Sequence, residues 1–216
     1  MGINIGLDIG AISLKLAALG RPADRPILDA LCATHPQFRM TEMGARPLVL
    51  SEYRRIAGSP IQSTYDLLQE FYEIVPEAQV EGIRVTGSGS RTIAKVLGLF
   101  FENEFKAIAR GLTGLHPDVV TVFEMGGETS KFLRLDTDGT TGRTGIVDYQ
   151  TTGDCAAGTG SFIDQQASRL LYEIEDVGDI VIAAGRAANI AGRCSVFAKS
   201  DMIHAQQKGY QPPEVL

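Results

Sequence analysis

The sequence predicts an α/β protein in which strands are interspersed with helices. Short apolar runs of strand length end in glycine turns, for example at Gly10 and Gly126. Between them lie longer runs in which apolar residues recur at helical spacing, most clearly over residues 104–115. With 216 residues, of which 44% are hydrophobic and 21% charged, the chain can bury the core of one large domain or two small ones.

Charge and hydropathy exclude several classes of partner. The net charge of −6 argues against a surface for nucleic acid or for an anionic membrane. No apolar run reaches the roughly 18 residues that span a bilayer, and the first residues lack the pattern of a signal peptide. Three cysteines are too few for a disulfide framework, so they are either buried thiols or metal or redox groups. We expect a cytoplasmic protein without nucleic-acid or membrane partners.

The chain opens with a predicted β-hairpin, formed by residues 3–9 and 14–19. Asp8 ends the first strand beside the turn at Gly10. A carboxylate in this position can hold Mg²⁺ while the N–H groups of the turn face phosphate. Taken alone, an Asp-x-Gly sequence also fits an ordinary tight turn.

The stretch that follows has weaker signals. Residues 27–34 predict a third strand, with Cys32 packed in the core. Residues 35–55 are interrupted by Pro36, Gly44 and Pro47 and predict a loop that keeps some apolar residues. The role of residues 36–55 is open.

Three further elements are predicted before residue 116. Apolar residues at helical spacing predict a helix over 63–75, with Ser63 as its N-cap. Residues 83–86 predict a short strand that runs into a glycine turn and a helix. Residues 104–115 predict another helix.

The opening pattern then recurs. Residues 119–124 form a continuous apolar run of the kind found in strands buried on both faces, and residues 131–135 predict the return strand. Between them, Glu124 precedes the turn at Gly126 and Gly127. Two candidate phosphate-binding turns in one chain are stronger evidence for phosphate binding than one such turn.

Two cysteines lie where the chain turns into a helix. Cys155 precedes a helix predicted from about residue 161 to 172, and Cys194 precedes one that ends near Gly209. Residues 146–150 predict a strand, and 177–184 a helical or mixed segment. A helix N-terminus favours an anion and lowers the pKa of a thiol. Two such sites amount to half of a four-thiolate set.

Five motifs occur in one order and carry a resemblance to a known family. The chain resembles the ATP-dependent activators of 2-hydroxyacyl-CoA dehydratases and the related ATPase subunits of benzoyl-CoA reductase. The resemblance covers residues 1–20 and 83–209. Its motifs are Asp8-x-Gly10, Thr86-Gly87-x-Gly89-x-Arg91, Gly126-Gly127-Glu128-x-x-Lys131, Cys155-Ala156-Ala157-Gly158-Thr159-Gly160-x-Phe162 and Cys194-x-Val196-Phe197-Ala198.

The resemblance implies an actin/Hsp70/sugar-kinase-like (ribonuclease H-like) fold. Residues 1–150 would form a first ATPase lobe and residues 151–216 the cysteine helices and the start of a second lobe. It also implies a homodimer that shares one [4Fe–4S] cluster, to which each subunit gives Cys155 and Cys194. In such proteins ATP hydrolysis sends one low-potential electron to a partner CoA-ester dehydratase or reductase.

The resemblance also assigns roles to single residues. Asp8 would position Mg²⁺, and Thr86, Gly87, Gly89 and Arg91 would shape a loop near the cleft. The family usually has Ser where Ala11 stands, and Asp-Ile-Gly-Gly-Gln where this chain has Glu124 to Glu128. A carboxylate in place of that amide can orient water or hold the metal, so the candidate catalytic residues are Asp8, Glu124 and Glu128. The candidate cofactor-binding residues are Gly10, Ser13, Lys15, Gly126, Gly127, Lys131, Gly158 and Gly160.

Alternatives remain open. Family members continue to a further glycine turn that grips adenosine, so we expect the chain to be a fragment of a longer protein. A kinase of the same fold would use both turns without the cysteines, with Asp154 as base. A non-catalytic nucleotide-binding module would keep the fold without turnover. In the plainest alternative, the cysteines are buried thiols and the turns are only turns.

Overall fold

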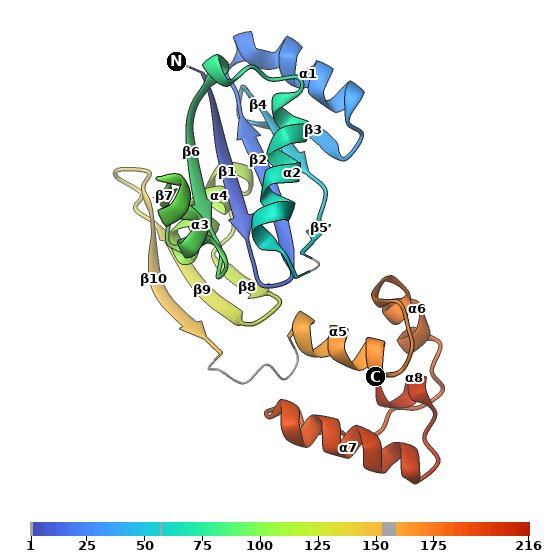
Figure 1. Ribbon diagram of the computed structural model, residues 1–216. Helices are drawn as coiled ribbons and strands as arrows, with labels where there is room; N and C mark the ends of the chain where they lie inside the picture. The colour runs from blue at the N-terminus through green and yellow to red at the C-terminus, as the bar shows by residue number, and fades with distance from the viewer. Residues whose placement is uncertain (1, 57, 153–158) are drawn as a thin grey trace. The chain divides into compact units, whose positions relative to one another are not determined.

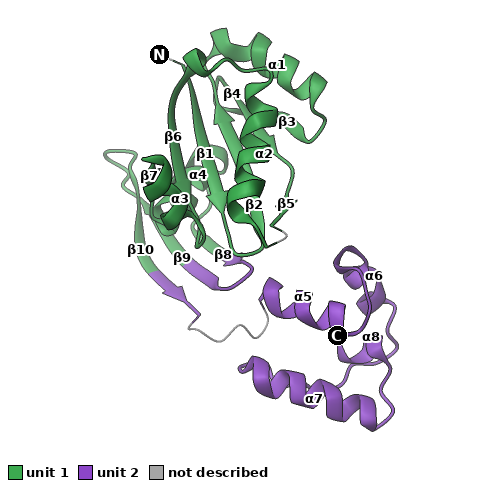
Figure 2. Cartoon of the chain, viewed as in Figure 1, with its two compact units in different colours: residues 1–122, 133–148 green, residues 123–132, 149–216 purple. Residues whose placement is uncertain are grey.

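The computed structural model describes residues 2–56, 58–152 and 159–216 (Figure 1). The chain divides into two compact units (Figure 2). Unit 1 contains residues 1–122 and 133–148, and unit 2 contains residues 123–132 and 149–216.

Within its described residues, unit 1 is built on a seven-stranded mixed sheet in the order β3-β4-β2-β1-β6-β7, with β5 paired to β2. The predicted N-terminal hairpin is confirmed: β1 and β2 pair antiparallel. On its other side, β1 pairs in parallel with β6, with Asp8 opposite Thr86. The strands are β1 (Ile3–Ile9), β2 (Ser13–Leu19), β3 (Phe38–Met43), β4 (Arg46–Ser51), β5 (Arg54–Arg55), β6 (Val80–Thr86) and β7 (Phe100–Phe101).

Helices bury one face of this sheet. Alternate residues of β1 point into the core, where they meet apolar side chains of α1, α2 and α3. Leu67 and Phe71 of α2, which crosses the sheet in Figure 1, are among the buried side chains. The helices of unit 1 are α1 (Arg25–Thr34), α2 (Pro60–Tyr72), α3 (Ser90–Leu97) and α4 (Glu104–Leu115), with short 3₁₀ turns at Pro22–Asp24 and Glu77–Gln79.

The strand predicted over residues 27–34 is wrong, because this segment is helix α1. Its two fully buried residues, Leu28 and Leu31, lie three apart and so share one helical face. Pro26, in the first turn, is a helix-start signal that the strand assignment overlooked. Cys32 packs against the core as expected, and burial, with Asp29 nearby, raises the pKa of its thiol.

The structure also differs from the prediction at two places between residues 35 and 75. The segment predicted as a loop forms the β3–β4 hairpin and the short strand β5. Its pattern is hard to recognise because the buried residues of β4 are consecutive rather than alternating. Helix α2 begins at Pro60 with Ser59 at the N-cap, so Ser63 lies inside the helix.

A second sheet has the order β10-β9-β8, with β8 (Thr121–Met125), β9 (Ser130–Thr137) and β10 (Thr144–Thr151). Helix α4, predicted with the same bounds, covers one face, where Ala109 packs with Leu133 and Leu135. The burial predicted for both faces of β8 is wrong, because Phe123 and Met125 are 73% and 80% exposed. Within the described ranges, no strand pairs with the outer edge of β8.

In its described residues, unit 2 continues into the helices α5 (Gly160–Arg169), α6 (Val177–Ile182), α7 (Ser195–Gln207) and α8 (Pro212–Val215), with a 3₁₀ turn at Ile174–Asp176. Phe162 of α5 and Leu170, which follows the helix, pack against the buried cluster of Met202 and Ala205 in α7 and Val215 in α8. Arg169 of α5 also donates a hydrogen bond to Oε1 of Gln206, at 3.0 Å. The two helices expected after the cysteines are therefore present and packed together. None of the helices described is both long and apolar enough to cross a bilayer.

Candidate functional site

The first glycine turn connects β1 to β2. The N–H of Gly10 donates to the carbonyl oxygen of Ser13 at 2.9 Å, which closes the turn. The Lys15 ammonium lies 3.2 Å from Oδ2 of Asp8 and 2.7 Å from Oγ of Ser13. The expected residues Asp8, Gly10, Ser13 and Lys15 therefore form one cluster at the end of the hairpin.

The turn after β6 supports this cluster. Gly87 has φ +99°, and a Cβ there would lie 2.4 Å from the carbonyl oxygen of Ile9 and 2.7 Å from Oδ1 of Asp8. The N–H of Gly89 donates to the same Ile9 oxygen at 2.9 Å. Since only glycine fits so close an approach with this φ, the Gly87 turn fixes where the Asp8 carboxylate stands.

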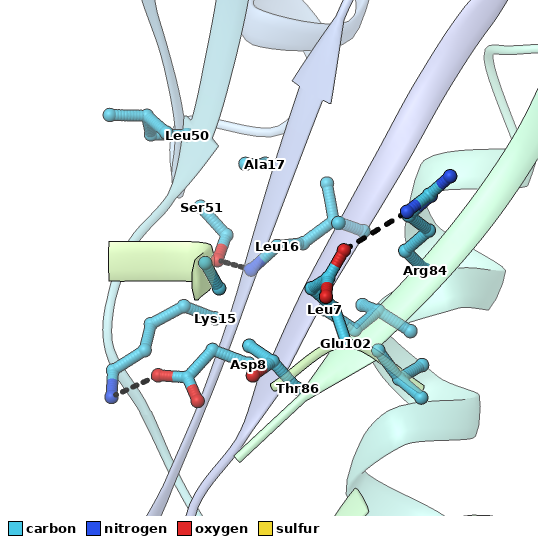
Figure 3. A pocket seen from close by; sticks show the side chains of 13 residues that line it. Leu7, Asp8, Lys15, Leu16, Ala17, Leu50, Ser51, Arg84, Thr86 and Glu102 are labelled. Atoms are coloured by element: carbon cyan, nitrogen blue, oxygen red, sulfur yellow. Dashed lines mark hydrogen bonds and ion pairs between the residues drawn. The ribbon is translucent and has the colours of Figure 1, made fainter. Parts of the chain in front are cut away.

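An open cavity of about 430 Å³ adjoins the first turn (Figure 3). The Lys15–Asp8 ion pair lies at one end and the Arg84–Glu102 ion pair at the other. Oγ1 of Thr86 is buried beside Asp8 and makes no hydrogen bond with the described residues. Between the two ion pairs, the lining of the cavity is mainly apolar.

The second glycine turn has the same internal arrangement. The N–H of Gly126 donates to the carbonyl oxygen of Thr129 at 3.0 Å. The Lys131 ammonium lies 2.9 Å from Oε2 of Glu124 and 3.1 Å from Oγ1 of Thr129. Glu128 lies on the turn itself. In both turns, a glycine, a hydroxyl residue and a lysine follow the acidic residue at the same spacing.

The sequence analysis did not identify Thr129 as a site residue. Thr129 contacts Lys131 in the second turn as Ser13 contacts Lys15 in the first. Its signal was available: each hydroxyl residue stands five positions after its acidic residue. Arg91, grouped with the loop after β6, lies with its guanidinium 4.7 Å from the ring centroid of Phe101.

The second turn is hydrogen-bonded to the start of α5. The N–H of Gly160 donates to the carbonyl oxygen of Gly126 at 3.0 Å, and the N–H of Ser161 to that of Gly127 at 2.8 Å. Gly160 is thus placed against the phosphate-turn candidate. Of the other predicted residues near this helix, Asp154, Cys155 and Gly158 lie outside the described residues.

Cys194 is the N-cap of α7, at the helix start that the sequence predicts. Its side chain is partly buried, and its carbonyl oxygen accepts the N–H of Ala198 at 2.8 Å. The loop before it is tied to the helix because the N–H of Ala191 donates to Oδ2 of Asp201 at 3.0 Å. Beside the cysteine, Val196 and Phe197 are exposed.

Comparison with curated proteins finds relatives over parts of the chain and over all of it. The 2-hydroxyisocaproyl-CoA dehydratase activator of Clostridioides difficile is 31% identical over 101 residues, which cover 47% of this chain and 36% of that protein. One of the subunits of benzoyl-CoA reductase from Thauera aromatica is 24% identical over 216 residues, covering the whole chain and 68% of the relative. The chain therefore spans about a third of the length of the first relative.

Comparison with solved structures establishes the fold. The activator of the 2-hydroxyisocaproyl-CoA dehydratase from Clostridium difficile, solved with bound ADPNP, matches with a TM-score of 0.69 and 22% identity, covering 98% of this chain and 68% of that one. The predicted α/β fold of the actin/Hsp70/sugar-kinase type is confirmed by this likeness. A family model matches residues 5–216 as well. The chain belongs to the BadF/BadG/BcrA/BcrD ATPase family.

Proposed function

We propose that the chain is the nucleotide-responsive part of an ATP-hydrolysing activator. It would send a low-potential electron from a [4Fe–4S] cluster, shared by two copies, to a CoA-ester dehydratase or reductase component in the cytoplasm. Family membership supports the ATPase part of this proposal. The names of the relatives, a dehydratase activator and a component of benzoyl-CoA reductase, support the kind of partner.

The observation that carries the proposal is the link between the second glycine turn and α5. The first two N–H groups of α5 are committed to the carbonyl oxygens of Gly126 and Gly127. A phosphate that repositions this turn would therefore move the start of α5, which directly follows the segment of Cys155. Phe162 packs against the buried cluster that contains Met202 of α7, and this packing would pass the movement to α7, the helix of Cys194.

Phosphate would be bound at each of the two turns. Asp8 is half exposed, which leaves its carboxylate open to Mg²⁺ or to a water in its shell. Gly10, Gly126 and Gly127 would admit phosphate to the backbone, while Lys15 and Lys131 add positive charge. Glu124 and Glu128 would orient the attacking water. In this division residues 1–150 form the nucleotide lobe and residues 151–216 carry the cysteines.

The described residues fit a shared cluster on the side of Cys194. Its side chain is partly buried and lies at the N-terminus of a 13-residue helix, where the helix dipole favours an anionic group such as the cluster. With Cys155, each chain has two ligands, and a two-fold axis supplies the four that a cubane needs. Exposed Val196 and Phe197 would be covered in such a dimer. When bound, the cluster supplies one-electron transfer, and Gly158 and Gly160 would allow backbone to approach it.

Anaerobic iron–sulfur reconstitution tests the cluster. We expect about four irons and four sulfides per dimer and an EPR signal after reduction. Cys155→Ala and Cys194→Ala should each abolish iron binding. Cys32→Ala is the matched control, because Cys32 packs in the core of unit 1 and should leave the iron content unchanged. Iron retained by Cys194→Ala would remove this residue from the ligand set.

Calorimetric titration with Mg–ADPNP tests the nucleotide site separately. Asp8→Asn keeps the size of the side chain but removes the charge, so affinity should fall while far-UV circular dichroism stays the same. Binding that is unchanged in Asp8→Asn would exclude Asp8 from the metal site. Nucleotide binding without iron in the reconstituted protein would favour a kinase or a non-catalytic module.

A further inference from the structure

We infer that Tyr53 is a positioning residue that holds the Lys15 ammonium in the first glycine turn. The inference rests on the proposed nucleotide function and adds a residue that lies outside the recognised motifs. Tyr53 belongs to the segment between β4 and β5, for which the sequence offered no role.

Three side chains in the described part of the chain contact the Lys15 ammonium. Two are polar: Oδ2 of Asp8 at 3.2 Å and Oγ of Ser13 at 2.7 Å. The third is the Tyr53 ring, whose centroid lies 5.5 Å from the Lys15 nitrogen. That distance is within the range of a cation–π attraction, so the ring adds a favourable contact without satisfying the N–H donors that phosphate would use.

Comparison of the two turns shows why Lys15 needs this contact. The Lys131 side chain is 10% exposed, and burial restricts the position of its ammonium. The Lys15 side chain is 40% exposed, and its partner Asp8 is 45% exposed. An ion pair so open to water is weakened by solvent and by side-chain freedom. The Tyr53 ring therefore helps to restrict the position of the Lys15 ammonium, as burial does for the ammonium of Lys131.

The residues that follow Tyr53 are held to the first turn and to α2. Strand β5, directly after it, pairs with β2 so that Arg55 lies opposite Ser13. The N–H of Ile56 donates to the carbonyl oxygen of Ile12 at 2.9 Å, inside the turn region itself. Arg54 contacts both carboxylate oxygens of Glu70 in α2, each at 2.7 Å. The backbone directly after Tyr53 is thus fixed beside the first glycine turn.

Removal of the Tyr53 ring should weaken the binding of nucleotide. An exposed cation–π contact of this kind corresponds to about a two- to fivefold change in an equilibrium constant. Tyr53→Leu keeps apolar bulk but removes the ring, so the affinity for Mg–ADPNP should fall by about that factor. Tyr53→Phe keeps the ring face and should bind like the wild type. Tyr65→Leu, at an exposed tyrosine of α2, is the matched control and should also bind like the wild type.

The experiment combines calorimetry with proton NMR of the Lys15 ε-methylene group. The signal of this group is identified by its absence from the spectrum of Lys15→Arg. Ring current should shift this signal upfield in the wild type and in Tyr53→Phe, and the shift should vanish in Tyr53→Leu. If Tyr53→Leu binds Mg–ADPNP like the wild type while Asp8→Asn binds weakly, the inference is overturned and the proposed function stands. If the wild type binds no nucleotide, both fail together. An ε-methylene signal that is identical in Tyr53→Leu and the wild type also refutes the contact.

Discussion

Gly87→Ala tests whether the turn after β6 fixes the Asp8 carboxylate. At φ +99° an alanine lies outside the left-handed helical region, which costs about 1–3 kcal/mol. The new Cβ would also lie 2.4 Å from the carbonyl oxygen of Ile9, and overpacking of this kind costs about 1–3 kcal/mol. We therefore expect the free energy of unfolding to fall by about 4 kcal/mol.

Gly98→Ala provides the control. Gly98 ends α3 with φ +65°, but a Cβ there would meet no atom within 4 Å. Its cost is the backbone term alone, about 1 kcal/mol. The difference of about 3 kcal/mol between the two variants combines the contact of Gly87 with β1 and the greater backbone strain at φ +99°.

Urea denaturation followed by far-UV circular dichroism suits this measurement, because the chain has no tryptophan. Gly87→Ala protein that remains folded should also bind Mg–ADPNP more weakly, since the new methyl group displaces Oδ1 of Asp8. Equal losses of stability in the two variants would refute the reasoning, because they would mean that the Gly87 turn relaxes without cost.

Three further predictions concern stability. Leu171 follows α5 with φ 63° and is 91% exposed, so Leu171→Gly should relieve about 1 kcal/mol of backbone strain and raise the midpoint of thermal unfolding; a lower midpoint would contradict this. Burial raises the pKa of Glu70, but hydrogen bonds from Arg54 and Gln37 outweigh it and leave that pKa below the ordinary value. This carboxylate therefore stabilises the fold above about pH 4.3 and loses the effect as pH falls through its folded pKa, so Glu70→Gln should flatten the acid limb of a stability–pH curve. Phe71 is fully buried, and Phe71→Ala should cost about 3–5 kcal/mol in urea denaturation; a loss below about 1 kcal/mol would show that the core of unit 1 repacks.

Much of the fold could be predicted because its signals are local. The hairpin β1–β2 depends on an apolar strand, a glycine and a return strand within 17 residues of sequence. Helix α4 has the predicted bounds because Asn103 caps it, accepting the Lys106 N–H, and its apolar residues keep helical spacing. Such features need no information from the rest of the chain.

One failure overlooked a local signal, and the others occur where distant contacts decide the structure. The apolar residues of α1 fit a strand as well as a helix until Pro26 is weighed. In β4, the partners on both sides in the sheet, rather than alternation, identify the strand. The candidate site divides in the same way. The glycines and acidic residues of both turns were predictable, whereas the bonds from Gly160 and Ser161 to the second turn join segments more than 30 residues apart and leave no local pattern.

The outer edge of β8 has a consequence for the behaviour of the chain in solution. Phe123 and Met125 occupy the positions in β8 that Leu7 and Ile9 occupy in β1. Leu7 and Ile9 are buried, whereas Phe123 and Met125 are exposed to water. The unpaired backbone N–H and C=O groups of such an edge strand can pair with a strand of another chain, which leads to aggregation. The net charge of −6 opposes this aggregation by repulsion, which salt weakens once the Debye length falls to about 8 Å near 0.15 M. Colloidal stability should therefore decline as salt is added, and light scattering at rising ionic strength would follow the growth of the particles.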